Sequence, residues 1–179
     1  MGGKGLKTVG GLLLAGSCFG ALPMSAQAAS CNPPQFADYP AAPASAPHSA
    51  AVRPQLTSKK ARLFRTAIRT DFSEPANFAG HYRVTIWGCG TDCRDFAIVD
   101  KHTGRVYTMP GETDVGGVMG NDDERIDFKP DSKLFIVSGC FNDDERCLAQ
   151  PKKLFYLWTG KTLRLVGQCP LQVERLTAE

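Results

Sequence analysis

The sequence predicts a mainly β fold: an antiparallel meander, a partial propeller-like sheet or a sandwich sheet, stapled by disulfides and with one N-terminal helix. From His81 onward, short runs rich in β-branched and aromatic residues alternate with polar residues and are separated by turn residues. Long helical stretches between these runs are missing, which argues against a parallel α/β fold. Seven cysteines are present, and six of them follow the N-terminal segment. An even number is typical of disulfide-braced exported domains.

Residues 1–28 are predicted to be a secretory signal peptide. Two lysines precede an apolar run that ends at Pro23, and small residues favour cleavage after Ala28. The run is too short for a permanent anchor across a hydrocarbon core of ~30 Å. No other apolar run predicts a transmembrane helix.

A lipid anchor at Cys18 is the less favoured alternative, because Ala15 stands where a lipobox usually has leucine. Processing by either signal peptidase predicts a periplasmic or secreted protein.

The remainder of the chain is large enough for one domain. Removing residues 1–28 from the 179 leaves 151 residues, which can bury a substantial core. The removed segment has two lysines and no acidic residue, so 19 basic and 18 acidic residues remain, a net charge of +1. A balance so close to zero gives no indication of a nucleic-acid partner.

We divide this remainder into an arm and a domain. Residues 29–56 are rich in proline and alanine, which predicts an extended spacer or a loosely held arm. Residues 57–179 are predicted to be a single β-rich domain that begins with a helix over 57–70. Thr57 or Ser58 can cap this helix. Four apolar residues share one face of it: Leu63, Phe64, Ala67 and Ile68.

Seven strands are expected after this helix. In the first, Tyr82, Val84 and Ile86 alternate with Arg83, Thr85 and Trp87. The other runs are 96–99, 105–109, 125–129, 134–137, 154–158 and 163–166. The glycine-rich stretch between Gly111 and Gly120 is interpreted as a flexible loop.

An internal repeat suggests an acidic surface. The sequence Asn-Asp-Asp-Glu-Arg at 121–125 recurs at 142–146, and each copy precedes a proline and then Lys-Leu-Phe. The repeated unit is predicted to be an acidic loop, a strand, a proline turn and a second strand. An antiparallel return would bring both loops to one end of the sheet. We expect a partner-binding rim there, formed by Asp122, Asp123, Glu124, Asp143, Asp144 and Glu145.

No cofactor is predicted. A Ca²⁺ ion shared by the two acidic loops is a less favoured alternative, because the acids are contiguous and the glycine of a chelating loop is missing.

Six cysteines allow 15 pairings, and the sequence alone does not choose among them. Proximity favours Cys89 with Cys93 and Cys140 with Cys147, each across a short loop. The remaining pair, Cys31 and Cys169, would then tie together the two ends of the mature chain.

Two short motifs resemble those of a known group of proteins. Phe-Ala-Gly-His-Tyr at 78–82 is followed by Trp-Gly-Cys-Gly at 87–90 and by Cys93. This pattern resembles an uncharacterised family of small exported bacterial proteins, over roughly residues 62–140. The resemblance implies export and a β domain, and it assigns no reaction. His81, Tyr82 and Trp87 are therefore motif residues of unknown role.

The motif segment does not predict a catalytic residue. On one extended strand, His81 and Cys89 would lie about 26 Å apart, too far for a base and its nucleophile. His102 is a better partner only if its hairpin tip returns near Cys89. A structural disulfide between Cys89 and Cys93 is favoured over a thiolate nucleophile. A zinc site from these cysteines and a histidine is disfavoured, because no Cys₂His₂ spacing is present.

The functional prediction is an envelope binding protein, more a binder than an enzyme. Its concrete form is an inhibitor or immunity protein against a cell-wall-degrading enzyme, because an acidic end would attract the basic enzymes that act on anionic cell walls. Disulfide-braced hairpins would also lose little entropy on binding. One alternative is a thiol-dependent or hydrolytic periplasmic enzyme that uses residues 81–93. Another is a structural envelope component.

Overall fold

The computed structural model describes seven stretches of the chain, which are residues 1–2, 31–43, 52–90, 93–109, 114–116, 124–142 and 144–171. Almost all of the predicted signal peptide, with Cys18, lies outside the described residues. So do three members of the predicted acidic rim: Asp122, Asp123 and Asp143.

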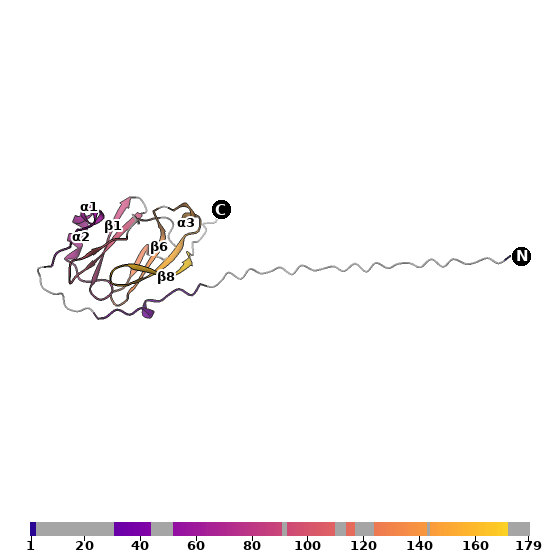
Figure 1. Cartoon of the computed structure of the whole chain (residues 1–179), viewed down its shortest axis with the longest axis horizontal. Coiled ribbons are helices and arrows are strands. Elements are labelled where there is room, and N and C mark those ends of the chain that lie inside the picture. Colours follow the sequence, from indigo (N-terminus) through magenta and orange to yellow (C-terminus); the bar gives the residue numbers. More distant parts are fainter. Residues whose placement is uncertain are drawn as a thin grey trace, which may run out of the picture. The chain divides into compact units, whose positions relative to one another are not determined.

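Eight strands form one antiparallel sheet, which confirms the predicted mainly β antiparallel fold (Figure 1). Neighbouring strands follow the order β1-β2-β4-β6-β7-β8, while β3 pairs with β2 and β5 pairs with β6. Strand order follows chain order, so the sheet is a meander. The strands are β1 (Tyr82–Gly90), β2 (Cys93–Asp100), β3 (Val106–Tyr107), β4 (Val115–Gly116), β5 (Ile126–Phe128), β6 (Leu134–Phe141), β7 (Lys152–Trp158) and β8 (Leu163–Pro170).

The sheet curls so that its two halves share a core. Tyr82 of β1 contacts Trp158 of β7 with ring centroids 5.2 Å apart, although three strands separate them in the sheet order. Phe96 of β2 likewise lies 4.9 Å from Phe135 of β6. Phe78 is completely buried at the centre of this aromatic cluster. One face of the meander is therefore turned inward on itself, and only the outer face needs other elements to cover it.

Two short helices cover the outer face over β1 and β2. They are α1 (Lys59–Leu63) and α2 (Arg65–Phe72), and Ser58 caps α1 as predicted. The single predicted helix is interrupted at Phe64, whose backbone is not helical and whose ring stacks on Trp87 at 4.5 Å. The placement of Leu63 on the apolar face was wrong, because this side chain is 67% exposed.

The arm covers the outer face over β6 and β7. Phe36, in the 3₁₀ turn Phe36–Asp38, and Tyr39 pack against a buried cluster that includes Leu134 and Phe155. Tyr39 also accepts a backbone hydrogen bond from Lys133 at 2.8 Å. Residues 31–43 are therefore extended, as predicted, but they are docked rather than loosely held.

Two differences from the predicted strands concern burial, one in the outer layer and one in the core. Thr85 and Trp87 are buried beneath the helices, whereas Ile86 is 40% exposed, so burial in β1 does not follow its apolar residues. Val115 is completely buried in β4, a strand inside the stretch that we interpreted as a flexible loop. Val115 pairs with both β2 and β6, so β4 connects the two halves of the sheet, which the interpretation as a flexible loop missed.

The predicted repeat is not a structural repeat. The first copy is followed by β5, but the second runs into a helix, α3 (Glu145–Ala149). Asp144 caps this helix by accepting hydrogen bonds from the amides of Arg146 and Cys147. The aspartate is present in both copies, so the difference comes from the residues that follow: Leu148 and Ala149 suit a helix, whereas Ile126 and Phe128 suit a strand. Within the described stretches, no helix has the length and apolar character needed to cross a bilayer.

Candidate functional site

The six cysteines that follow the predicted signal peptide form three disulfides. Cys89 pairs with Cys93, Cys140 with Cys147 and Cys31 with Cys169. These are the same pairs that proximity in the sequence favoured. Cys89 is therefore neither a thiolate nucleophile nor a thiolate metal ligand, because its sulfur is bonded to that of Cys93.

The first motif forms a tight turn just before β1, and this turn is hydrogen-bonded to the loop between β5 and β6. Phe78 and Tyr82 exchange backbone hydrogen bonds around a turn in which Ala79 and Gly80 have positive φ values of 44° and 85°. The Gly80 amide donates to the carbonyl of Pro130 at 2.7 Å. A Cβ on Gly80 would lie 2.5 Å from a carbonyl oxygen of the arm, so a glycine is required here. The motif is thus largely structural, and its polar side-chain groups are the imidazole of His81 and the hydroxyl of Tyr82.

The second motif ends β1 at a hairpin. Trp87 is buried under Phe64, and the register of β1 against β2 shifts between Gly88 and Gly90. The Cys89–Cys93 disulfide closes this hairpin. The motif therefore fixes the end of β1. Its two cysteines offer no reactive thiol, because they are bonded to each other.

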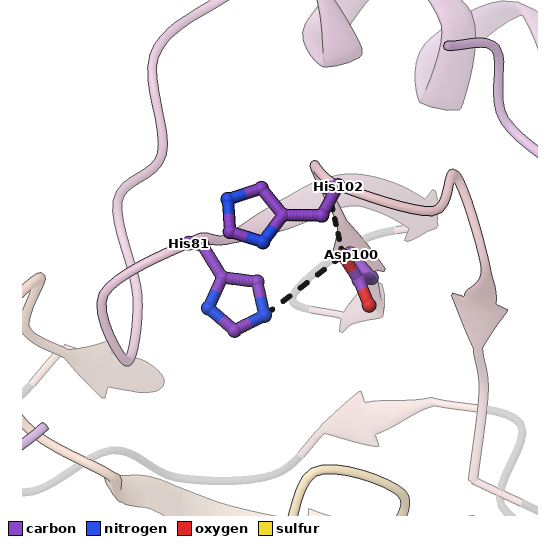
Figure 2. A group of neighbouring side chains, drawn as sticks. All are labelled: His81, Asp100 and His102. Carbon is purple, nitrogen blue, oxygen red and sulfur yellow. Dashed lines mark hydrogen bonds and ion pairs between the residues drawn. The ribbon is translucent and has the colours of Figure 1, made fainter. Parts of the chain in front are cut away.

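His81 lies against the hairpin that joins β2 to β3. Its ring stacks on that of His102, with centroids 4.2 Å apart and planes 3° apart. Its Nε2 lies 3.9 Å from Oδ1 of Asp100. Figure 2 shows the two imidazole rings beside each other, with the Asp100 carboxylate close to both residues. One ligand-type atom from each of the three residues lies within 4.8 Å of the others.

The backbone holds these three residues in place. The pairing of β1 with β2 sets Tyr82 opposite Asp100, so the chain just before β1 lies beside the hairpin that leaves β2. Oδ1 of Asp100 accepts hydrogen bonds from the amides of His102 at 2.8 Å and Thr103 at 3.1 Å. The Lys101 amide donates to the His81 carbonyl at 3.1 Å. The cluster is therefore fixed by the hairpin.

The imidazole of His81 is neutral at neutral pH. Burial lowers its pKa below the ordinary value of 6.5, and His102 lowers it further, while Asp100 acts in the opposite direction. Because the ring is uncharged, the 3.9 Å contact with Asp100 is not a salt bridge at that pH. One nitrogen of a neutral imidazole carries a lone pair, which can accept a hydrogen bond or bind a metal ion.

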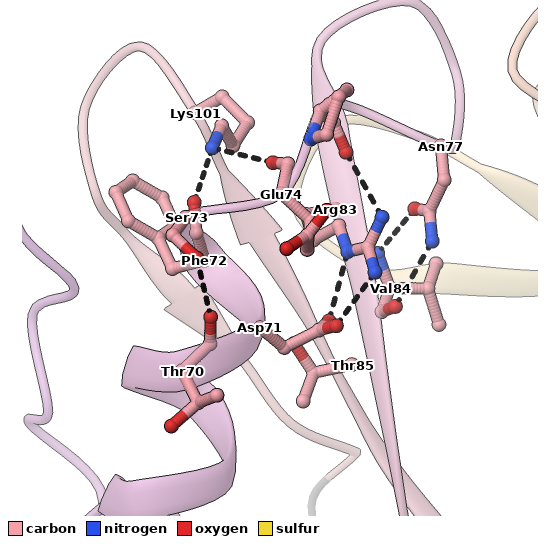
Figure 3. Close-up of polar contacts among 11 residues, drawn as sticks. Thr70, Asp71, Phe72, Ser73, Glu74, Asn77, Arg83, Val84, Thr85 and Lys101 are labelled. Atoms are coloured by element: carbon pink, nitrogen blue, oxygen red, sulfur yellow. Dashed lines mark hydrogen bonds and ion pairs between the residues drawn. The ribbon is translucent and has the colours of Figure 1, made fainter.

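A polar network beside the cluster fastens α2 to β1 and to the hairpin (Figure 3). The guanidinium of Arg83 donates twice to Asp71, at 2.6 and 2.8 Å, and the Thr85 hydroxyl donates to the same carboxylate. Lys101 donates to the carbonyls of Phe72 and Glu74 at the end of α2. Lys101, the residue directly before His102, therefore joins the helix to the hairpin.

Burial alone would raise the pKa of Asp71, but hydrogen bonds from Arg83 and Thr85 outweigh it. The pKa of Asp71 consequently lies below its ordinary value, as expected for an ion-paired carboxylate.

A groove of about 420 Å³ lies between the docked arm and the outer face of the sheet. Its apolar walls include Pro34 and Phe36 from the arm and Phe155 from β7. Two charged residues of opposite sign, Asp127 and Lys153, also line it. Burial raises the pKa of Asp127, and Lys153 reduces this effect. The arm that the sequence left without a role thus builds one wall of the groove.

Three of the predicted acidic residues are described. Glu124, Asp144 and Glu145 are exposed. Ile126 pairs with Val137 in the middle of β6 and the two strands are antiparallel, so Glu124 lies toward the C-terminal end of β6. The Asp144 carboxylate already caps α3, which leaves the two glutamates as the free acidic side chains among these three.

Sequence reasoning named His81 and His102 but did not bring them together. It missed Asp100 altogether. A signal was present, because Asp100 precedes a Thr-Gly turn and an aspartate at such a position commonly accepts amides of the turn.

The chain has no counterpart among the proteins with which it was compared. No family model, no curated protein and no solved structure matches it.

Proposed function

We propose that this protein is an exported binding protein that recognises a protein partner in the cell envelope, and that it is not a thiol-dependent enzyme. The observation that carries the proposal is the pairing of all six cysteines after the signal segment. A thiol enzyme needs a free thiolate. Disulfides that close the β1–β2 hairpin and link β6 to α3 instead give rigid surfaces, which lose little conformational entropy on binding.

The partner class that we propose is a basic cell-wall-degrading enzyme, which the protein would inhibit. The exposed glutamates Glu124 and Glu145 support this, because Glu124 precedes β5, which runs antiparallel to β6, and Glu145 opens the helix that follows β6. The Cys140–Cys147 disulfide braces α3, which carries Glu145. A negative surface on a braced element favours association with a positively charged partner.

The test is binding and inhibition with purified basic cell-wall hydrolases, measured by the clearing of a cell-wall suspension. The double variant Glu124→Gln/Glu145→Gln removes two charges from the proposed surface and should weaken binding by about 10-fold at low salt, since each exposed charge contributes modestly. Glu74→Gln/Asp131→Asn is the matched control. It removes two exposed charges elsewhere, and Asp131 lies in the turn at the other end of β5 and β6.

Unchanged binding of the Glu124/Glu145 variant would rule out the acidic surface. Titration of free thiols in the mature protein tests the broader proposal, and we expect none. A single reactive thiol at Cys89 or Cys93 would instead support the enzyme alternative.

A further inference from the structure

We propose that His81, Asp100 and His102 form a binding site for one divalent transition-metal ion of the Zn²⁺ type. This site lies apart from the acidic residues of the proposed partner surface, and the inference does not depend on that function. It rests on two imidazoles and one carboxylate that the fold brings together from the start of β1 and from the hairpin after β2.

The ligand set selects the class of ion. Imidazole nitrogen and carboxylate oxygen together suit borderline divalent ions such as Zn²⁺, Ni²⁺ and Cu²⁺. Calcium and magnesium prefer sites made entirely of oxygen ligands. The described residues contain one other group of suitable composition, Cys89, Cys93 and Asp114, but two of its members are joined in a disulfide and offer no thiolate.

The spacing is close to what an ion requires. In a tetrahedral site with bonds of about 2.0–2.1 Å, ligand atoms lie about 3.3 Å from each other. The three ligand atoms here lie within 4.8 Å of one another. Each therefore moves by roughly 1 Å to enclose an ion. Rotation of a partly exposed side chain supplies such a movement without displacing the backbone.

Binding must separate the stacked rings. A metal ion lies in the plane of each imidazole that binds it, whereas the rings of His81 and His102 are parallel and 4.2 Å apart (Figure 2). At least one ring has to rotate to direct its nitrogen toward a common point. The hydrogen bonds from Lys101 to His81 and from the hairpin amides to Asp100 involve the backbone, so they persist through this rotation.

The surroundings prepare the ligands for an ion. Both amide hydrogen bonds to Asp100 reach the same oxygen and orient the carboxylate, as groups behind a metal ligand commonly do. The His81 side chain is 31% exposed and that of Asp100 only 10%. An ion can therefore enter from solvent and meet a shielded negative charge.

Three protein ligands leave a coordination position open. Such sites keep a water molecule or accept a ligand from a partner. We therefore expect reversible binding with exchange.

Isothermal titration with ZnCl₂ tests the site. The mature protein is purified without a polyhistidine tag, with its disulfides intact, and titrated in a non-coordinating buffer at neutral pH. We expect one ion per chain. His81→Gln and His102→Gln should each weaken binding by at least about 10-fold, because the loss of even an indirect contributor to a metal site has that effect. His48→Gln is the matched control, since His48 is the third histidine of the chain and is not one of the three proposed ligands.

NMR of the imidazole C–H groups gives a second readout. Zn²⁺ should shift the ring signals of His81 and His102 and leave those of His48 unchanged. Circular dichroism checks that the variants are folded, and His102→Gln decides the matter if His81→Gln unfolds, because His102 lies in a turn. Wild-type affinity in His102→Gln, or no saturable binding by the wild type, would overturn the proposal.

Discussion

The long disulfide should stabilise this protein far more than the hairpin disulfide. Cys31 and Cys169 are 138 residues apart in sequence, whereas Cys89 and Cys93 are four apart. In the loop-entropy model, closing the long loop removes entropy from the unfolded chain worth about 5 kcal/mol, and closing the short one about 2 kcal/mol. The two bridges should therefore differ by about 3 kcal/mol.

The perturbation is the double variant Cys31→Ala/Cys169→Val, in which valine keeps the volume of the buried Cys169 side chain. Its matched control is Cys89→Ala/Cys93→Ala. Urea unfolding of both variants and of the oxidised wild type gives the free energies of unfolding. Equal losses in the two variants would refute the entropic reasoning, and a larger loss in the control would show that the hairpin bridge acts through native packing.

Three further predictions follow from the core, the ion pair and the hairpin. Phe78→Ala should lower the free energy of unfolding by about 3–5 kcal/mol in urea, because the ring is fully buried among other aromatic rings. The lowered pKa of Asp71 means that its pairing with Arg83 stabilises the fold above the ordinary value of 3.8 and is lost as the pH falls below it. The stability gap between wild type and Asp71→Asn in urea should thus narrow in acid, and a constant gap would contradict this. Gly104→Ala should lower the melting temperature more than Gly160→Ala. Both glycines have a positive φ, a conformation that costs alanine about 1–2 kcal/mol. Only at Gly104 would the new Cβ also collide with a backbone carbonyl of the arm.

The sequence predicted the strands because their periodicity is local. The first predicted run begins at Tyr82, and so does β1. The predicted run 154–158 ends at Trp158, and so does β7. The order of the strands also followed from the absence of long connections. In contrast, the exposure of Ile86 and the burial of Thr85 could not be predicted, because which face of a strand is buried depends on what covers it.

The role of the arm was hidden for a similar reason. Proline content indicates an extended backbone but does not identify the surface on which that backbone packs. Phe36 and Tyr39 cover β6 and β7 through contacts with residues about 100 positions further along the chain, such as Ser132 and Lys133. Only the pairing of Cys31 with Cys169 hinted that the arm returns to the end of the sheet.

The candidate metal site depends on register, which the sequence leaves open. His81 and His102 meet only because Tyr82 is paired with Asp100. A shift of one residue would send the side chains to the opposite face and separate them. The buried alternation of Tyr82 and Val84 against Ile98 fixes this register. The core of the protein thus determines the geometry of a polar cluster at its surface.

The two coverings of the sheet are secured in different ways, and this has a consequence for folding. The helices hold the half formed by β1 and β2 through buried side chains such as Ile68 and through the ion pair of Asp71 with Arg83. The arm contributes fewer buried side chains, and the Cys31–Cys169 bridge links it to β8. A reduced chain should therefore keep the helix-covered half and expose the half that the arm covers. Oxidation then completes the second layer of the fold, which suits a protein that matures in an oxidising compartment.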